Sequence, residues 1–282
     1  MKRFIFPLIL LVALGFAACE KVIDLDLPES EPQLVVDAWY TDEDTTQYVK
    51  LSTTAPYFED QQAPRVSDAI VTLRTFENED LIESVALSED PENPGFYLIP
   101  EPAELGKGYQ LEVDAPGFDP VRSDIQEILE TPPIFDIYWE ASDPSFEDSL
   151  AIYKVFISTF EFPGEGDAYR WFAWVDGEYQ NKPENLYIAN DLLVDGAVLP
   201  QFEPTDHQYR FGSEVRITQC RINQSAYDYL ALLRQQTAFI GSPFDTPPAP
   251  LIGNMKFINK EGQALGFFGA SSTSTAEVTV GL

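Results

Sequence analysis

The sequence predicts an all-β fold that carries one helix. Short segments rich in β-branched and aromatic residues recur at intervals of roughly 10–14 residues, and apolar and polar side chains alternate within them. Turn signals separate the segments, most clearly Asn93-Pro94-Gly95 and Ala115-Pro116-Gly117. Short strands at this spacing are typical of a β-sandwich.

We expect the first domain, residues 32–130, to be an immunoglobulin-like sandwich. Its predicted strands are 34–42, 47–55, 69–76, 81–87, 95–100, 109–115 and 120–128. Thr131-Pro132-Pro133 then breaks the pattern, because two consecutive prolines force an extended, stiff connection. We therefore place the domain boundary at residue 131.

The second domain, residues 131–282, is predicted to be β-rich with one helix at about 224–238. Asn223 or Ser225 can cap this helix, and Tyr229, Leu230, Leu233 and Phe239 recur near helical spacing. We expect the helix to lie across a sheet. The predicted strands are 134–141, 153–162, 169–179, 214–222, 254–260, 264–272 and 276–280.

The amino terminus has the layout of a secretory signal peptide. Lys2 and Arg3 precede the uncharged stretch 4–18, which ends in the small residues Ala17 and Ala18. The stretch is about 15 residues long, whereas a helix that crosses a bilayer needs about 20. We expect residues 1–18 to be a signal peptide.

Cys19 directly follows these small residues and is the predicted site of lipidation. Ala17-Ala18-Cys19 resembles the lipobox of bacterial lipoproteins, in which the thiol is acylated and the leader is cut off; Phe16 departs from the usual small aliphatic residue. Several acyl chains anchor a protein stably, since each buried methylene contributes about 0.8 kcal/mol. Residues 19–31 are then a lipid-anchored tether, and the alternative is an ordinary signal peptide with an incidental cysteine.

The charge balance speaks against nucleic acid as a partner. The chain has 47 acidic and 17 basic residues, a net charge of −30, and no window offers clustered Lys and Arg. The acidity fits a solvated surface, and calcium or a basic partner remains an alternative. The short acidic runs lack the spacing of a calcium-binding loop, so we predict no metal site.

Residues for catalysis are scarce, and we predict that the protein is not an enzyme and needs no cofactor. The only histidine, His207, follows Asp206, but no nucleophile elbow or zinc motif accompanies it, so we expect a solvated surface group. Cys220 has no partner once Cys19 is acylated, and we expect it to be buried. Pairs of acids are too numerous to be informative, so a hydrolase that uses acids alone stays open.

Aromatic residues could offer a recognition surface. The notable ones are Tyr57-Phe58, Trp139, Trp171-Phe172, Trp174 and the Pro-rich loop 242–250. At least one of Trp171 and Phe172 must point inward, because neighbouring residues of a strand face opposite sides. Core packing is the alternative for the group. The candidate partner-contact residues lie in that loop and in the strand that follows it: Phe244, Asp245, Pro247, Pro248, Phe267 and Phe268.

Several landmarks together resemble a family of Bacteroidota lipoproteins known as domain-of-unknown-function family 4249. They are Cys19-Glu20-Lys21-Val22-Ile23-Asp24 with Leu27-Pro28, 34–39, Pro56-Tyr57-Phe58, 66–73, Thr131-Pro132-Pro133, and the ending from 242–244 through 266–271. The resemblance implies an outer-membrane lipoprotein, often encoded beside a TonB-dependent receptor. Glu20, Asp24 and Asp26 look similar to the signal that sends such lipoproteins to the cell surface. The resemblance to this family implies no catalytic residues.

We therefore expect a non-enzymatic accessory or binding subunit of a TonB-dependent receptor system, attached to the outer membrane through lipid on Cys19. One alternative is a stand-alone surface lipoprotein that binds a glycan or a peptide. Another is the hydrolase that uses acidic residues only. The sequence identifies no small-molecule ligand.

Overall fold

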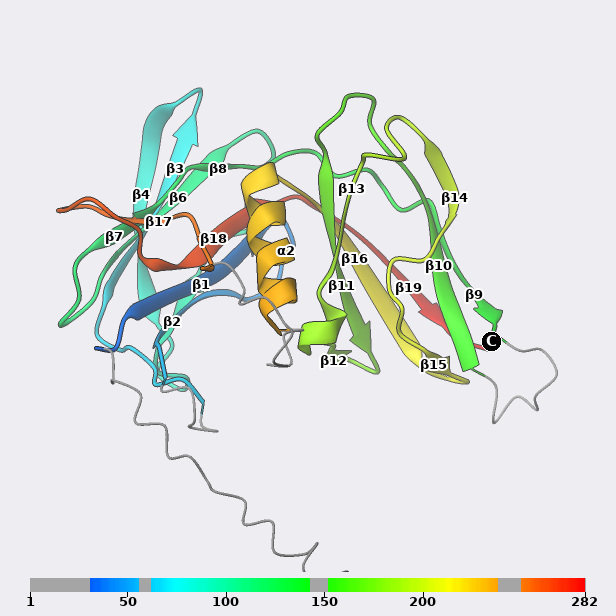
Figure 1. Ribbon diagram of the computed structural model, residues 1–282, viewed down its shortest axis with the longest axis horizontal. Helices are drawn as coiled ribbons and strands as arrows, with labels where there is room; N and C mark the ends of the chain where they lie inside the picture. Colours follow the sequence, from blue (N-terminus) through cyan, green and yellow to red (C-terminus); the bar gives the residue numbers. More distant parts are fainter. Residues whose placement is uncertain (1–30, 56–61, 143–151, 238–249, 282) are drawn as a thin grey trace, which may run out of the picture. The chain divides into compact units, whose positions relative to one another are not determined.

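Nearly all regular structure in the described part of the chain is β-strand, which confirms the all-β fold with one helix. The computed structural model describes residues 31–55, 62–142, 152–237 and 250–281. Pro32–Leu282 form one compact unit (Figure 1). The predicted signal peptide and Cys19 lie outside the described residues.

A ten-stranded sheet contains the strands of the predicted first domain. Its order is β17-β7-β6-β3-β4-β5-β2-β1-β18, and β8 pairs with β6. These strands are β1 Leu34–Thr41, β2 Gln47–Thr53, β3 Ile70–Glu77, β4 Asp80–Glu89, β5 Phe96–Ile99, β6 Gly108–Asp114, β7 Val121–Ser123, β8 Gln126–Glu127, β17 Met255–Phe257 and β18 Leu265–Ser271.

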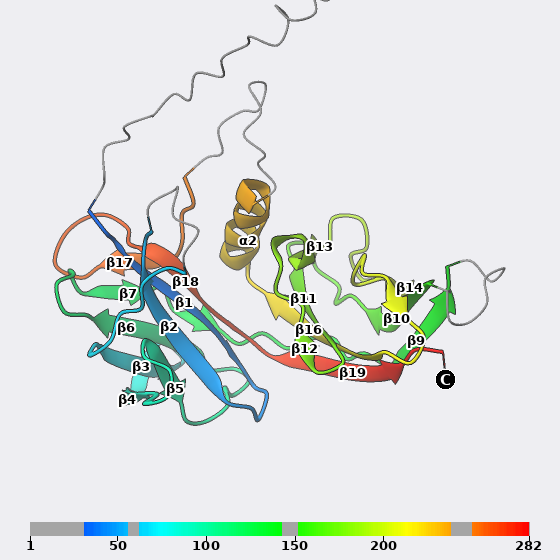
Figure 2. The ribbon, with the colours of Figure 1, turned by 90° about the horizontal axis from the view of Figure 1, so that it is seen from below.

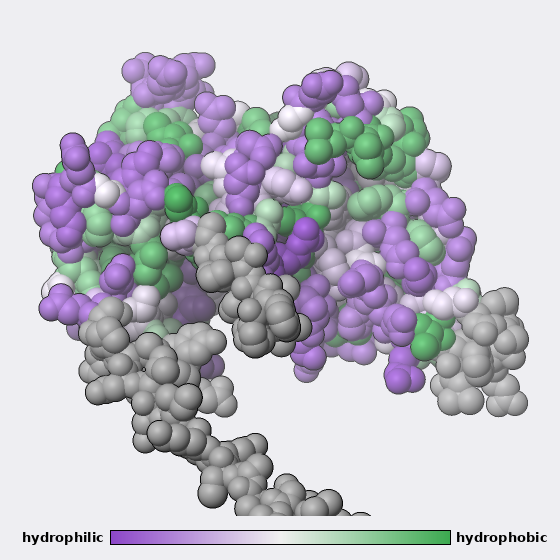
Figure 3. Space-filling view, in the orientation of Figure 1, coloured by the Kyte–Doolittle hydropathy of each residue, from purple (hydrophilic) through white to green (hydrophobic). Residues whose placement is uncertain are grey.

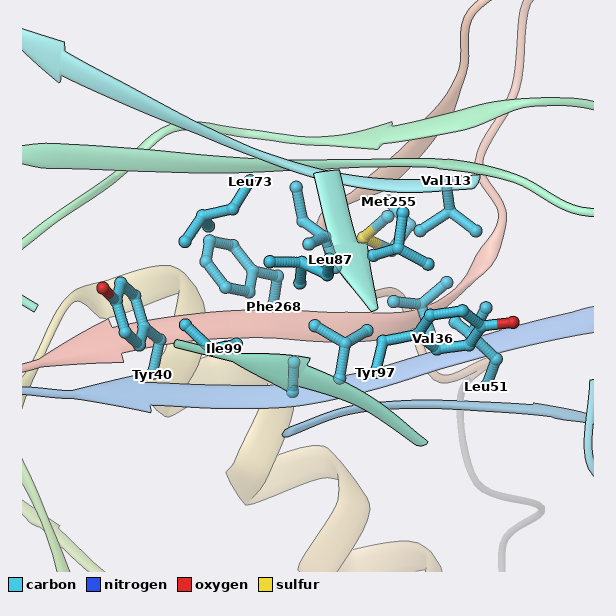
Figure 4. Close-up of a cluster of buried hydrophobic side chains, with 14 of the residues drawn as sticks. Val36, Tyr40, Leu51, Leu73, Leu87, Tyr97, Ile99, Val113, Met255 and Phe268 are labelled. Atoms are coloured by element: carbon cyan, nitrogen blue, oxygen red, sulfur yellow. The ribbon is translucent and has the colours of Figure 1, made fainter. Parts of the chain in front are cut away.

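The core of this sandwich lies between β1, β2, β5 and β18 on one side and β3, β6 and β7 on the other (Figure 4). Alternation along β1 places Val36, Ala38 and Tyr40 inside. Leu73 and Val113 approach them from the facing strands, and the buried residues form one continuous cluster. Burial of a large aliphatic side chain contributes about 1.5–3 kcal/mol, so this cluster is the main stabilising feature of the sandwich.

Two strands from the end of the chain complete the sandwich. β17 pairs with β7, and β18 runs parallel to β1, with Asp37 opposite Phe267. The strands approach closely at Gly266, where a Cβ would overlap the carbonyl of Val36. Only glycine fits there. The domain boundary at residue 131 stays a prediction, but β17 and β18 belong to the sheet that the first domain forms.

The remaining strands form two further sheets that face each other. One contains β14-β10-β15 with β9 on β10, and the other contains β12-β11-β16-β19 with β13 on β11 (Figure 2). Side chains from β10, β11 and β16 fill the space between them, among them Val155, Trp171 and Ile217. These strands are β9 Asp136–Ala141, β10 Ile152–Phe160, β11 Ala168–Val175, β12 Glu178–Tyr179, β13 Tyr187–Asn190, β14 Val198–Phe202, β15 Tyr209–Arg210, β16 Glu214–Ile222 and β19 Thr273–Thr279.

The helix α2, Gln224–Thr237, confirms the predicted element at 224–238. Asn223 caps it, because its side-chain oxygen accepts a hydrogen bond of 2.9 Å from the backbone N–H of Ala226. Ala226 and Leu230 pack with Phe267 of β18 and with residues of β16, so the helix does lie across a sheet, as expected. A short 3-10 helix, η1 (Pro183–Asn185), lies near its far end.

Two of the segments that connect the sandwich with the other sheets, at Thr131 and at Ser272, are hydrogen-bonded to each other. The backbone N–H of Thr131 donates to Oγ of Ser272 at 2.8 Å, and the Thr131 hydroxyl accepts from the Arg221 N–H at 2.8 Å. Gln219 donates to the carbonyl of Pro132 at 2.9 Å. The predicted stiff connection is therefore packed in place by side chains from both sides.

Candidate functional site

A groove lined with aromatic rings lies between the outer face of β1–β2 and the outer face of β11–β16. It consists of two adjoining clefts of about 320 Å³ and about 620 Å³. Both are lined by Trp39, Lys50, Phe172 and Tyr179. We call the combined space the aromatic groove. Its size is within the range of about 300–1,000 Å³ found for small-molecule sites.

Alternation along β11 decides which side chains face the groove. Trp171 is buried between the two sheets and donates a 2.9 Å hydrogen bond from Nε1 to Oε1 of Gln219. Arg170 and Phe172 point the other way and line the groove, as Trp174 does further along the strand. The prediction that one of Trp171 and Phe172 points inward is confirmed, and it is Trp171.

Four rings form a continuous cluster in the groove. The Trp39 and Phe172 centroids are 6.3 Å apart in an edge-to-face arrangement. Tyr179 lies 5.9 Å from Phe172 and 5.3 Å from Trp174. Such pairs contribute about 0.5–1.5 kcal/mol beyond their burial, so the rings hold one another in a fixed surface.

Trp39 is the ring that the sandwich contributes, and two contacts position it. Its Nε1 donates to Oγ of Ser271 at 3.0 Å. Its ring lies over Gly269 of the neighbouring strand β18, where any Cβ would overlap the ring. The absence of a side chain at Gly269 therefore lets Trp39 lie flat against β18.

Two arginines contact these rings, and they differ in their partners. Arg216 lies 4.6 Å from the Trp174 centroid and donates a 2.6 Å hydrogen bond to Glu43. Arg170 lies 4.7 Å from the Trp39 centroid and 4.1 Å from that of Phe172. Its guanidinium makes no hydrogen bond or ion pair with any described residue.

A second cluster of polar residues lies on the other side of β11 and is buried. Tyr169 donates to Oε1 of Glu161 at 2.8 Å. Burial, together with Asp167 and Asp191, raises the pKa of Glu161 to about 7. Asp191 accepts hydrogen bonds from the backbone of 166–167, so these carboxyl groups have structural partners.

The sequence-predicted contact residues are placed differently from the expectation. Phe244, Asp245, Pro247 and Pro248, like Cys19, lie outside the described residues. Phe268 is buried in the sandwich core, and Phe267 is buried against Tyr229 of α2 with 4.8 Å between ring centroids. Phe268 is therefore not exposed to a partner, whereas the edge of Phe267 lines the larger cleft, and its role in a partner contact stays a prediction.

The remaining sequence expectations concern single residues. Cys220 is buried, as expected, and burial raises the pKa of its thiol to about 12. His207 is half-buried rather than fully solvated, because its ring packs 4.8 Å from that of Tyr209. Burial lowers the pKa of His207.

Sequence reasoning did not single out Arg170, Tyr179 or Lys50 as site residues. The alternation along 169–179 was a signal for which side chains share a face. It could not show that this face looks toward β1 and β2, which come from a distant part of the chain.

Fold and groove together define an all-β protein with a small-molecule-sized aromatic site. A model of the family described as a domain of unknown function (DUF4249) matches residues 20–277, and the chain belongs to this family. No curated protein matches the sequence. Among the described residues, no helix combines the length and the apolar character that crossing a membrane requires.

Proposed function

We propose that the protein is a non-enzymatic, lipid-anchored binding subunit of an outer-membrane uptake system that works with a TonB-dependent receptor. The aromatic groove is the surface that holds the ligand. Lipid on Cys19 is its attachment to the membrane.

The aromatic groove is the observation that carries the binding role. Its rings come from two sheets and are positioned by one another, by Ser271 and by the close approach at Gly269. Rigid aromatic side chains lose little conformational freedom on binding, and they dominate recognition sites for that reason. The larger cleft, of about 620 Å³, combines aromatic and aliphatic side chains with polar ones, as ligand sites do.

The amino-terminal sequence supports the anchor. Lys2 and Arg3, the apolar stretch 4–18 and Ala17-Ala18-Cys19 follow in the order of a lipoprotein precursor. The resemblance of the chain to Bacteroidota lipoproteins supports the link to a TonB-dependent receptor.

The same rings support a second candidate, a stand-alone surface lipoprotein that binds a glycan or a peptide. Exposed aromatic faces can stack against sugar rings or against peptide side chains without a receptor. A hydrolase is less well supported, because Glu161 has a raised pKa but only 4 % of its surface is exposed.

Purification of the intact protein from gently solubilised membranes tests the proposal. We expect a large outer-membrane barrel protein to copurify, and mass spectrometry to find an acylated Cys19. Cys19→Ser should release the chain from the membrane fraction. Retention in the membrane of a Cys19→Ser chain from which the leader has been removed would contradict the anchor. Purification without a barrel, but with a bound glycan or peptide, would favour the second candidate.

A further inference from the structure

We propose that the aromatic groove binds an organic carboxylate and that Arg170 is the residue that recognises it. This inference rests on the proposed function, since it takes the groove as the ligand site, and it adds the chemical class of the ligand.

The charge of the larger cleft is opposite to that of the chain. The whole sequence has 47 acidic and 17 basic residues. Among the described residues that line this cleft, the basic ones are Lys50, Arg170 and Lys182, and the acidic one is Asp37. The cleft therefore attracts an anion although the protein as a whole repels one.

Arg170 has the free hydrogen-bonding capacity that such an anion needs. A guanidinium carries five N–H donors, and those of Arg170 bond to no described residue. Two other arginines of the same sheet are paired, Arg216 with Glu43 and Arg221 with Asp167. Among the described arginines of this sheet, Arg170 is therefore the one whose N–H donors are available to an acidic ligand.

The rings of Trp39 and Phe172 hold the guanidinium of Arg170 in position for binding. Its guanidinium lies 4.7 Å from the Trp39 centroid and 4.1 Å from the Phe172 centroid. Contacts with ring faces hold the planar group and exclude water from it, which strengthens a charge-assisted hydrogen bond. The fork of N–H groups matches the two oxygens of a carboxylate.

The other residues that line the larger cleft indicate which kind of molecule can carry the carboxylate. Tyr229, Leu233 and Phe172 provide apolar surface next to the guanidinium. The net charge of −30 penalises each negative charge on a ligand, so a monoanion is favoured over a dianion. The groove therefore fits a small carboxylate with an aromatic or aliphatic body.

Lys50 and Lys182 have secondary roles at the same cleft. Lys50 lies 3.8 Å from Asp37, so part of its charge is already neutralised. Lys182 is exposed beside η1 and makes no ion pair with a described residue. We expect both to attract the anion and Arg170 to bind it.

Calorimetric titration of the full-length mature protein in detergent tests the inference. The probes are indole-3-acetate and its neutral analogue indole-3-acetamide. We expect the carboxylate to bind about tenfold more tightly than the amide, a difference of about 1.4 kcal/mol, since a charge-assisted hydrogen bond is stronger than one to a neutral group. Arg170→Gln should remove this preference, and Arg170→Lys should keep part of it. Arg210→Gln, an exposed arginine of β15, is the matched control and should leave it unchanged.

The comparison of the two probes also tests the inference in the unaltered protein, so it does not depend on the folding of a variant. Equal binding of acid and amide, with both lost in Trp39→Ala, would overturn the carboxylate class but keep the groove as a ligand site. Failure of both probes at millimolar concentration would overturn the carboxylate class and count against the groove. An acetylated peptide with a C-terminal tryptophan, compared with its C-terminal amide, distinguishes a peptide terminus from a free small acid as the source of the carboxylate.

Discussion

Replacement of Glu161 by glutamine should stabilise the protein above pH 7 and leave its stability unchanged below pH 4.5. Glu161 follows β10 and is buried beside Tyr169, with Asp167 and Asp191 nearby. Burial is the main reason that its pKa rises from the ordinary value of 4.5 to about 7. The neighbouring carboxyl groups raise it further, whereas the hydrogen bond from Tyr169 opposes the rise.

The sign of the effect follows from proton binding. Between pH 4.5 and 7 the folded chain keeps a proton on Glu161 that the unfolded chain has released, so the free energy of unfolding falls as pH rises. Each unit of pKa difference corresponds to 1.36 kcal/mol, which gives a loss of about 3 kcal/mol across this window. Glutamine has no proton to lose, and its amide oxygen can still accept the hydrogen bond from Tyr169.

Urea unfolding followed by tryptophan fluorescence, at about pH 4 and about pH 8, measures this effect. We expect the difference in unfolding free energy between Glu161→Gln and the unaltered protein to grow by about 3 kcal/mol from the lower to the higher pH. Glu83→Gln removes an exposed carboxyl group from β4 and is the matched control. An equal difference for Glu161→Gln at both pH values would refute the reasoning.

Three other predictions concern packing and chain organisation. Gly269→Ala should destabilise the protein by about 1–3 kcal/mol and lower its thermal midpoint, because the added Cβ overlaps the ring of Trp39. Trp39→Leu in the same chain should restore part of this stability. An unchanged midpoint in Gly269→Ala would contradict the overlap. Cys220 should resist iodoacetamide in the folded protein and react in urea, because burial raises its pKa to about 12; mass spectrometry of prompt labelling without urea would refute this. A fragment of residues 32–130 should show no cooperative unfolding by circular dichroism, because it lacks β17 and β18 and the core side chains they provide; a sharp transition would count against this reading.

Sequence patterns located most of the strands because one face of each is buried. The predicted segment 34–42 corresponds to β1, and 69–76 corresponds to β3 within one residue. The segment 120–128 is divided into β7 and β8, because the N–H of Asp124 turns away to bond with the carbonyl of Asn254. Asn254 is distant in the sequence, so the pattern of residues 120–128 contains no signal for this hydrogen bond.

Three short strands, β13, β14 and β15, were not predicted. Each lies at an edge of its sheet, where pairing with one neighbour suffices and alternation is weak. Pro200 within β14 also argues against a strand, and it is tolerated because β14 lies at an edge. Local propensity cannot predict strands that depend on the neighbour they join.

The sequence around Phe267 and Phe268 contains a signal for the burial of both side chains. The run Leu265–Ser271 is nearly continuous in small and apolar residues, which is typical of a strand covered on both faces. The sandwich core covers one face and α2 covers the other. The groove, by contrast, combines residues of separate sheets, and only the assembled fold shows that they meet.

The parallel pairing of β1 with β18 has a consequence for the order in which the chain can fold. β1 is among the first described strands to be synthesised, whereas its parallel neighbour β18 is among the last. Contacts so distant in sequence form slowly, because closing a long loop costs entropy before the contact repays it. The export that we propose would gain from this delay, since the sandwich cannot be completed until β18 has been synthesised.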